Sequence, residues 1–206
     1  MPVVTIRGQM GSGAPEIGKK VADRLHIDYV DRDIIAQVAE RLRWSKQGIE
    51  AKETPPGTFL GRVAEALGSS SAYEGAYLPA WQIPLEDTRY LAGLESVIKE
   101  LAESQSIVIM GRGSQFILKG KPGVLHVLVV TPFDIRVNRL AKIKSQDEET
   151  TKKEIEHFDR SYREFIKRYF QADLEETLHY DLVINTAYLS YEAATSIIVQ
   201  AVPLKR

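Results

Sequence analysis

Five short runs of apolar residues recur along the chain, and stretches with helical periodicity or turns separate them. The runs are residues 3–6, 27–30, 106–110, 124–130 and 181–185. Their β-branched and aliphatic character is typical of strands buried on both faces of a parallel sheet. Apolar residues spaced three and four apart predict helices between the strands, including 88–103, 148–170 and 190–202. The alternation predicts an α/β protein with a doubly wound, five-stranded parallel sheet.

One long segment, residues 44–87, interrupts this alternation. It contains clusters of Pro, Gly and Ser and both tryptophans of the chain. A connection of this length is unusual as a bare linker, so we expect a helical insertion within a single domain spanning residues 1–206. Its aromatic residues Tyr73, Tyr77 and Trp81 are compatible with stacking on a ligand or with packing a small core of the insertion itself.

The composition is that of a globular protein with nearly balanced charge. The formal net charge is −1, which argues against a general nucleic-acid binder and leaves small molecules as the expected partners. The chain has no cysteine, which excludes disulfides and cysteine-based metal sites. No apolar run reaches the roughly 20 residues needed to span a membrane, so we expect a cytoplasmic protein that does not insert into membranes. The sequence permits an oligomer without specifying one.

The first strand leads into a glycine-rich turn that predicts a phosphate-binding site. Gly8, Gly11 and Gly13 follow the strand, and Pro15 suits the first turn of a helix. A helix that begins at such a turn directs unpaired N–H groups at one point, where an anion binds. The spacing between Gly8 and Gly13 matches the P-loop pattern, but Ala14 and Pro15 replace its Lys and Ser/Thr. A dinucleotide fingerprint is matched less well, because Glu16 replaces its third glycine.

Polar residues follow other strands at the edge of the sheet where ligands bind in open α/β folds. Asp31 and Asp33 follow the second strand, where each is a candidate ligand-binding residue or a helix cap. Arg112 lies between two glycines after the third strand and suits phosphate binding, although a surface turn gives the same pattern. His126, inside the fourth strand, is expected to be a structural histidine. The charged run 159–168 is compatible with a solvated helix face as well as with a functional role.

Several short motifs, taken in order, resemble those of the cytidylate kinase-like family of P-loop nucleoside monophosphate kinases. They are Gly11–Gly13, Glu16–Gly18, Tyr29–Arg32, Val108–Gly113, Asp159–Arg163 and Tyr180–Thr186. The resemblance covers most of the chain and implies a three-layer P-loop fold with a helical insertion at 44–87 and an Arg-rich lid helix at 148–170. It also implies transfer of the γ-phosphate of ATP to a CMP- or dCMP-like acceptor, with Mg²⁺ bridging the phosphates.

The resemblance also implies roles for individual residues. Arg112 would bind the acceptor phosphate, and Arg160, Arg163 and Arg168 would stabilise the phosphoryl group in transfer. The remaining assignments are Gly8, Gly11, Ser12, Gly13, Ala14 and Glu16 for the nucleotide, and Asp31, Arg32 and Asp159 for the acceptor. Glu16 is either a ligand of Mg²⁺ or a helix N-terminal residue that complements the helix dipole.

One departure from the family pattern leaves two interpretations of the function open. The family commonly has Gly-Arg where this chain has Ala14 and Pro15, so even the cation that substitutes for the P-loop lysine is missing. Loss of such a charge would weaken transition-state stabilisation, and proline removes one N–H from the anion-binding turn. Two hypotheses therefore stand. The protein is an active (d)CMP-preferring kinase, or it is a catalytically weak or inactive nucleotide-binding relative with a sensing or structural role.

Overall fold

The computed structural model describes residues 1–31 and 88–205, and their centre is a five-stranded sheet. The strands are β1 (Val3–Gly8), β2 (Asp28–Val30), β3 (Ile107–Met110), β4 (Val124–Val130) and β5 (Leu182–Asn185). Their order is β2-β3-β1-β4-β5, and every neighbouring pair is parallel. Because β1 is central, it is flanked on both sides, with Ile6 beside Met110 of β3 and Val127 of β4.

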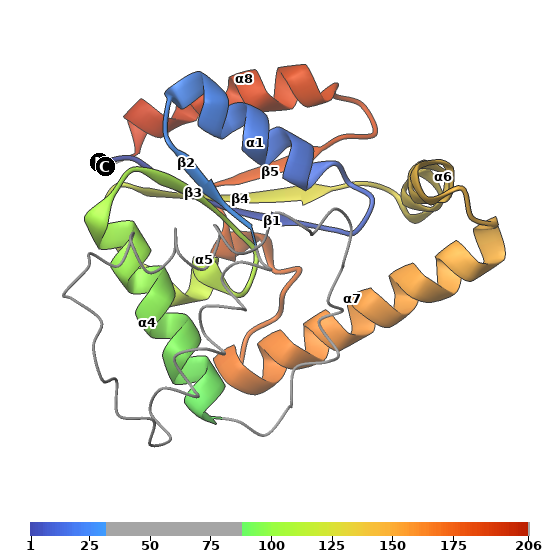
Figure 1. Cartoon of the computed structure of the whole chain (residues 1–206), viewed down its shortest axis with the longest axis horizontal. Coiled ribbons are helices and arrows are strands. Elements are labelled where there is room, and N and C mark those ends of the chain that lie inside the picture. Colours follow the sequence, from blue (N-terminus) through green and yellow to red (C-terminus); the bar gives the residue numbers. More distant parts are fainter. Residues whose placement is uncertain (32–87, 206) are drawn as a thin grey trace, which may run out of the picture.

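Helices cover both faces of the sheet (Figure 1). They are α1 (Ala14–Leu25), α4 (Thr88–Ser104), α5 (Ser114–Ile117), α6 (Phe133–Lys144), α7 (Glu148–Phe170) and α8 (Tyr191–Ala201), with short 3-10 turns η2 (Thr177–His179) and η3 (Val202–Leu204). One hydrophobic core joins the sheet to α1 and α8, and another joins its opposite face to α4, α5 and α7. This arrangement is a three-layer α/β sandwich, which confirms the predicted fold class.

The predicted element boundaries agree closely with the structure. The bounds of β4 and α7 are as predicted, whereas β2, β3 and β5 each begin one residue later. The one-turn helix α5 was missed, because four residues are too few to show helical periodicity. The first strand is longer than the apolar run, and so it includes Arg7. The predicted insertion at 44–87, with Tyr73, Tyr77 and Trp81, lies outside the described residues, as does Asp33.

Hydrogen bonds explain two local features, and the second confirms the structural role predicted for His126. The Oγ of Ser190 accepts from the backbone N–H of Ala193, 3.1 Å away, and so caps α8. His126 is an interior residue whose Nδ1 lies 2.7 Å from Oγ1 of Thr5 on the adjacent strand. Burial lowers the pKa of His126, and Lys205 reinforces this effect while Asp181 opposes it. His126 therefore belongs to the packing of the sheet.

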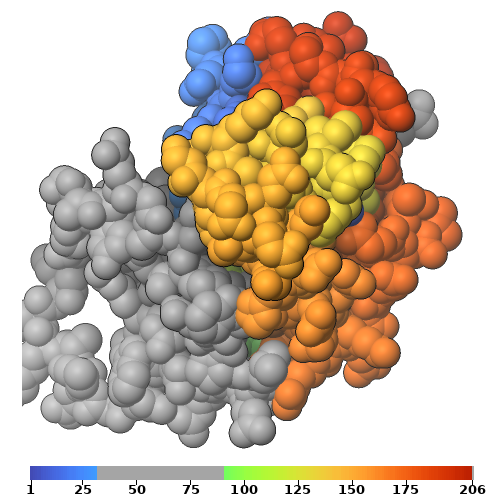
Figure 2. Space-filling model, turned by 90° about the vertical axis from the view of Figure 1, so that its right-hand side faces the viewer, coloured from blue at the N-terminus to red at the C-terminus, as the bar shows by residue number. Residues whose placement is uncertain are grey.

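All five strands point their carboxyl ends toward the same edge. In Figure 2 this side of the molecule presents α6, with the first turns of α7 below it and α1 and α8 above. The chain segments that follow β1, β3 and β4 therefore converge under α6 and α7. No helix in residues 1–31 or 88–205 is both long and apolar enough to cross a membrane.

Candidate functional site

The loop between β1 and α1 forms a tight backbone turn that requires glycine. Gly11 and Gly13 both have φ of 83°, a left-handed conformation that side chains disfavour. A Cβ atom on Gly13 would lie 2.1 Å from the ring of Tyr191, and one on Gly8 would lie 2.0 Å from Cβ of Ala14. Gly13 is the N-cap of α1 and has no side-chain cap. The first N–H groups of α1 are thus left to bind an anion.

The side chains of this loop are suited to a phosphate in one respect and unsuited in another. Ser12 is fully buried, and its Oγ has no hydrogen-bond partner among the described residues. A buried hydroxyl of this kind is explained if a ligand atom completes its hydrogen bonding. Ala14 is buried, however, and adds no charge to the loop. The lysines of α1 make their contacts elsewhere, since Lys20 pairs with Glu192 and Lys19 lies over the ring of Tyr29.

An arginine from α6 brings a positive charge to this loop. Nη1 of Arg136 donates to the carbonyl oxygen of Met10 at 3.4 Å, and its backbone packs directly against Gly11. Nη2 of Arg136 forms an ion pair with Oδ2 of Asp159 at 2.8 Å, and both side chains are buried. Arg136 therefore connects the glycine loop to α7. The sequence pattern did not single out Arg136, because its two partners are distant in the sequence.

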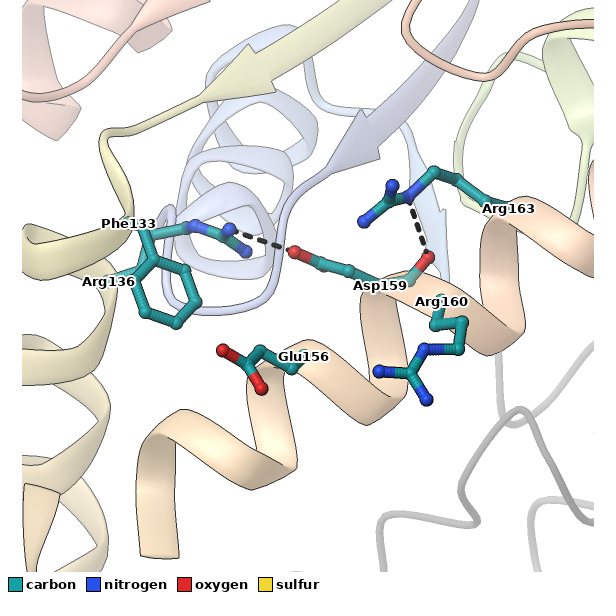
Figure 3. A pocket seen from close by; sticks show the side chains of 6 residues that line it. All are labelled: Phe133, Arg136, Glu156, Asp159, Arg160 and Arg163. Atoms are coloured by element: carbon teal, nitrogen blue, oxygen red, sulfur yellow. Dashed lines mark hydrogen bonds and ion pairs between the residues drawn. The ribbon is translucent and has the colours of Figure 1, made fainter. Parts of the chain in front are cut away.

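A cavity of about 440 Å³ opens beside this ion pair (Figure 3). It is lined by Phe133, Arg136, Glu156, Asp159, Arg160 and Arg163. Three predicted site residues thus lie together on α7: Asp159, predicted for the acceptor, and Arg160 and Arg163, predicted for the phosphoryl group in transfer. Nε of Arg163 donates to the backbone carbonyl of Asp159 at 3.2 Å, and Oδ1 of Asp159 has no partner in the described part of the chain.

Arg168 lies farther along α7 than this cavity. It is exposed, and the residues that line the cavity do not include it. From Arg163 to Arg168 the helix turns by about 140°, so the two side chains leave different faces of α7. The arrangement favours Arg160 and Arg163 over Arg168 for contact with a ligand, and the role of Arg168 stays a prediction.

The predicted acceptor residues at the ends of β2 and β3 occupy the same edge of the sheet. Arg112 is buried and has φ of 54°, an uncommon conformation for a residue other than glycine. The N–H of Gly111 donates to the carbonyl of Ile6 at 2.9 Å, which places the start of this turn beside β1. Asp31 is half-buried at the end of β2. Arg32 lies outside the described residues.

A second network that sequence reasoning missed supports the loop from the side of β5. Thr186 is buried, and its hydroxyl donates to the carbonyl of Ser12 at 2.8 Å. Arg139 holds Thr186 through Nη1 to Oγ1 at 3.0 Å and through Nη2 to the backbone carbonyl at 2.7 Å. The guanidinium of Arg139 lies over the ring of Tyr191, 5.5 Å from its centre. Burial raises the pKa of Tyr191, and the positive charge of Arg139 opposes this rise.

One carboxylate near the loop, that of Glu16, is available to a metal ion. No group of three or more His, Cys, Asp or Glu residues that could hold a metal occurs in residues 1–31 and 88–205. Glu16 is exposed in the first turn of α1, close to the glycine turn. Mg²⁺ in nucleotide sites is commonly held by one or two carboxylates together with phosphate oxygens and water. A single carboxylate at Glu16 is therefore compatible with Mg²⁺ that arrives with a nucleotide.

The sheet order and the glycine loop at the end of β1 define a protein with the fold of the P-loop kinases. A solved shikimate kinase from Bacteroides thetaiotaomicron has a similar structure, with a TM-score of 0.53, 14% sequence identity and 98% of each chain covered. An uncharacterised protein from Eubacterium ventriosum is more similar in structure, with a TM-score of 0.71, 17% identity and coverage of 98% of this chain and 99% of that one.

Sequence comparison identifies the family within this class of proteins. The profile of the cytidylate kinase-like family matches residues 3–188, and the chain belongs to that family. The cytidylate kinase of Methanothermobacter thermautotrophicus is 25% identical over 193 residues, which cover 93% of this chain and 99% of that protein. The cytidylate kinase of Archaeoglobus fulgidus is 25% identical over 209 residues, which cover 98% and 96%. The predicted family is thereby confirmed.

Proposed function

We propose that the protein transfers the γ-phosphate of ATP to a CMP- or dCMP-like acceptor, with the help of Mg²⁺. The observation that carries this proposal is the direct connection between the glycine loop and the arginine-lined cavity. Arg136 bonds both the loop carbonyl of Met10 and the carboxylate of Asp159 in the cavity wall. The names of the relatives support cytidylate as the acceptor. Because the substrates would be cellular nucleotides, we place the activity in the cytoplasm.

In this proposal the residues of the chain bind, orient and neutralise phosphate charge. The N–H groups of the glycine turn and of the first turn of α1 hold the phosphates of the donor, and Ser12 contributes its hydroxyl. Glu16 offers one carboxylate to Mg²⁺, which supplies positive charge between the phosphates when bound. Arg160 and Arg163 line the cavity beside the loop, where charge develops on the moving phosphoryl group. Arg112 serves the acceptor from the end of β3.

Phosphoryl transfer places few demands on a protein base. Catalysis rests mainly on the alignment of donor and acceptor and on stabilisation of negative charge. The α7 residues therefore act as a lid in the proposal, because they add charge and exclude water above the loop. Arg168 is the least favoured of the four proposed catalytic arginines, since it lies outside the cavity wall.

One specific observation favours a second candidate, a weak or inactive nucleotide-binding protein. The loop offers no lysine and no metal-binding hydroxyl at the P-loop positions, because these are Ala14 and Pro15. Arg136, a cation that contacts the loop, already has Asp159 as a counter-ion at 2.8 Å. Its charge is therefore neutralised internally, which suits binding without turnover.

A single assay separates the two candidates. The protein is incubated with ATP, Mg²⁺ and each common nucleoside monophosphate, and formation of ADP is followed. We expect ADP to form fastest with CMP or dCMP. ATP binding without turnover on any acceptor would favour the second candidate, and failure to bind ATP would refute both. The replacement of Lys153, an exposed residue of α7 that pairs with Glu149, by Ala provides a control for unspecific effects on this helix.

A further inference from the structure

Arg7 is a buried cation that the proposed mechanism does not use. It is the last side chain of β1 before Gly8, and only 2% of it is exposed. Val4 and Ile6 of the same strand pack in the core with α1 and α8. Since side chains alternate along a strand, Arg7 projects from the opposite face of the sheet, toward α7. Its guanidinium lies 5.3 Å from the centre of the Tyr162 ring.

The hydrogen-bonding groups of Arg7 are largely unsatisfied. Its Nη2 donates to Oε1 of Glu175 at 3.3 Å, and Nε and Nη1 have no partner within the described residues. The Glu175 side chain is 41% exposed, so it approaches the buried guanidinium from the solvent side. Nε2 of Gln9 contacts the other oxygen of Glu175 at 3.4 Å. Buried unpaired donors are unfavourable in a folded protein, which calls for an explanation at this position.

In the described part of the chain, the groups around Arg7 include no other charged acceptor that is hydrogen-bonded to it. Oε1 of Gln115 is also buried without a partner, while Nε2 of Gln115 donates to the hydroxyl of Tyr180 at 3.2 Å. Burial raises the pKa of Tyr180, so its hydroxyl stays neutral and donates to the carbonyl of Leu174 at 2.8 Å. Among these neighbours Glu175 alone carries a negative charge. A weakly held, half-exposed carboxylate thus occupies a place that suits an exchangeable oxyanion.

An oxyanion bound at Arg7 would be separate from the phosphates of the donor, because Arg7 lies on the other face of the sheet. The N–H groups that would hold the donor belong to the glycine turn and α1, which packs on the other face of the sheet. On the Arg7 side, the hydroxyl of Tyr162 accepts from the N–H of Gly113 at 3.2 Å. Tyr162 therefore links Arg7 to the turn after β3, which carries Arg112. Arg7 and Arg112 are thus two buried arginines near the carboxyl ends of the adjacent strands β1 and β3.

We propose that Arg7 binds the phosphate of the acceptor nucleotide, with Glu175 occupying its place in the ligand-free protein. This inference rests on the proposed function and adds to it a residue that selects phosphorylated acceptors. A neutral nucleoside would leave the guanidinium without an oxyanion partner, whereas a monophosphate satisfies donors that are otherwise buried and unpaired. Arg7 would contact the substrate directly, and Glu175 would act only by giving way to it.

The test is calorimetric binding of CMP, cytidine and ATP to the full chain and its variants. We expect the unmodified protein to bind CMP about tenfold or more tightly than cytidine, the size of effect of a charge-assisted hydrogen bond. Arg7→Met should abolish this difference and leave cytidine and ATP binding unchanged. Glu175→Gln should strengthen CMP binding by about threefold, because a competing half-exposed ion pair is removed. Arg24→Met, a surface arginine of α1 that pairs with Glu192, is the control and should change none of these affinities.

Thermal unfolding separates a binding role from a structural one. Methionine keeps the approximate length of the side chain and removes the unpaired donors, so Arg7→Met should unfold at the same temperature or higher. A lowered unfolding temperature with an unchanged preference for CMP would make Arg7 a structural residue and overturn the inference. If Arg7→Met does not fold, the Glu175→Gln variant provides the test. An unchanged CMP affinity in Glu175→Gln would contradict displacement of Glu175 by the phosphate.

Failure of this inference is distinguishable from failure of the proposed function. If ADP forms with CMP but the preference for CMP over cytidine survives in Arg7→Met, the function stands and the role of Arg7 is refuted. If the preference depends on Arg7 but no ADP forms, the inference stands and the catalytic proposal is refuted. If no common monophosphate binds more tightly than its nucleoside, the inference is wrong whatever the turnover.

Discussion

The glycine loop and helix α7 face each other across the candidate site, but the loop offers backbone groups and the helix offers charged side chains. The loop offers backbone N–H groups, and it requires positive φ angles at Gly11 and Gly13 and close packing at Gly8, Gly11 and Gly13. Helix α7 contributes charged side chains, among which Arg160 and Arg163 are exposed. In the proposed function, phosphate binding and the charge for phosphoryl transfer therefore come from separate elements. Arg136 and Asp159 are the link between them.

The largest expected effect comes from breaking that link. Asp159→Ala leaves Arg136 buried without its counter-ion, and we expect the free energy of unfolding to fall by about 3–5 kcal/mol. The double variant Arg136→Met with Asp159→Leu should recover much of this loss, because a buried ion pair is often replaceable by apolar residues. Urea denaturation measures both. The exposed pair of Lys153 and Glu149 is the control, and its loss in Lys153→Ala should cost less than about 1 kcal/mol. An equal cost for both single variants would mean that the link is unimportant.

The next largest effect concerns the loop alone. In Gly13→Ala, the left-handed backbone costs about 1–2 kcal/mol, and collision with the Tyr191 ring adds about 1–3 kcal/mol. We expect ATP binding to be lost together with this stability. Gly120→Ala is a matched control, since Gly120 has φ of 75° but no atom within 4 Å of an added Cβ. It should show only the backbone cost in denaturation and normal ATP binding in calorimetry. If the two variants behave alike, close packing around Gly13 is not what shapes the loop.

In helix α7, a substitution should lower the rate of CMP turnover and leave the unfolding temperature nearly unchanged. Arg163→Ala removes an exposed cation from the cavity wall, and we expect turnover of CMP to fall by about 100-fold, as for loss of one transition-state donor. Its unfolding temperature should stay within about 2 °C of the original. Arg168→Ala in the same assay tests whether the catalytic arginines are those that line the cavity. A larger loss for Arg168→Ala than for Arg163→Ala would contradict the arrangement proposed above.

The smallest expected effect lies away from both regions, in the sheet that supports them. Burial holds the pKa of His126 below its usual value, so the unfolded chain takes up a proton at a higher pH than the native protein. Stability should therefore decline as the pH falls from about 7.5 to about 5.5, through the ordinary histidine pKa of about 6.5. His126→Asn should flatten this decline by about 2 °C in thermal unfolding. An identical pH dependence in both proteins would exclude His126 as its source.

Local sequence signals account for the parts of the site that depend on the backbone. The apolar runs predicted all five strands, because a buried parallel strand needs apolar residues on both faces. The glycine turn was identifiable because positive φ angles require glycine in a short stretch of chain. In contrast, Arg7, Arg136 and Arg139 were missed. Their partners lie far along the chain, with Met10 126 residues from Arg136 and Glu175 168 residues from Arg7.

The sequence by itself thus determined the fold, the family and the position of the glycine turn. Each of these follows from periodicity, conformational preference or ordered motifs within short segments. Only the tertiary structure decided which charges are buried together. It paired Arg136 with Asp159, placed Arg160 and Arg163 at one cavity, and left Arg7 with unpaired donors beside the turn of Arg112. Charge pairing depends on distances between segments and on desolvation, and neither quantity is encoded in local sequence.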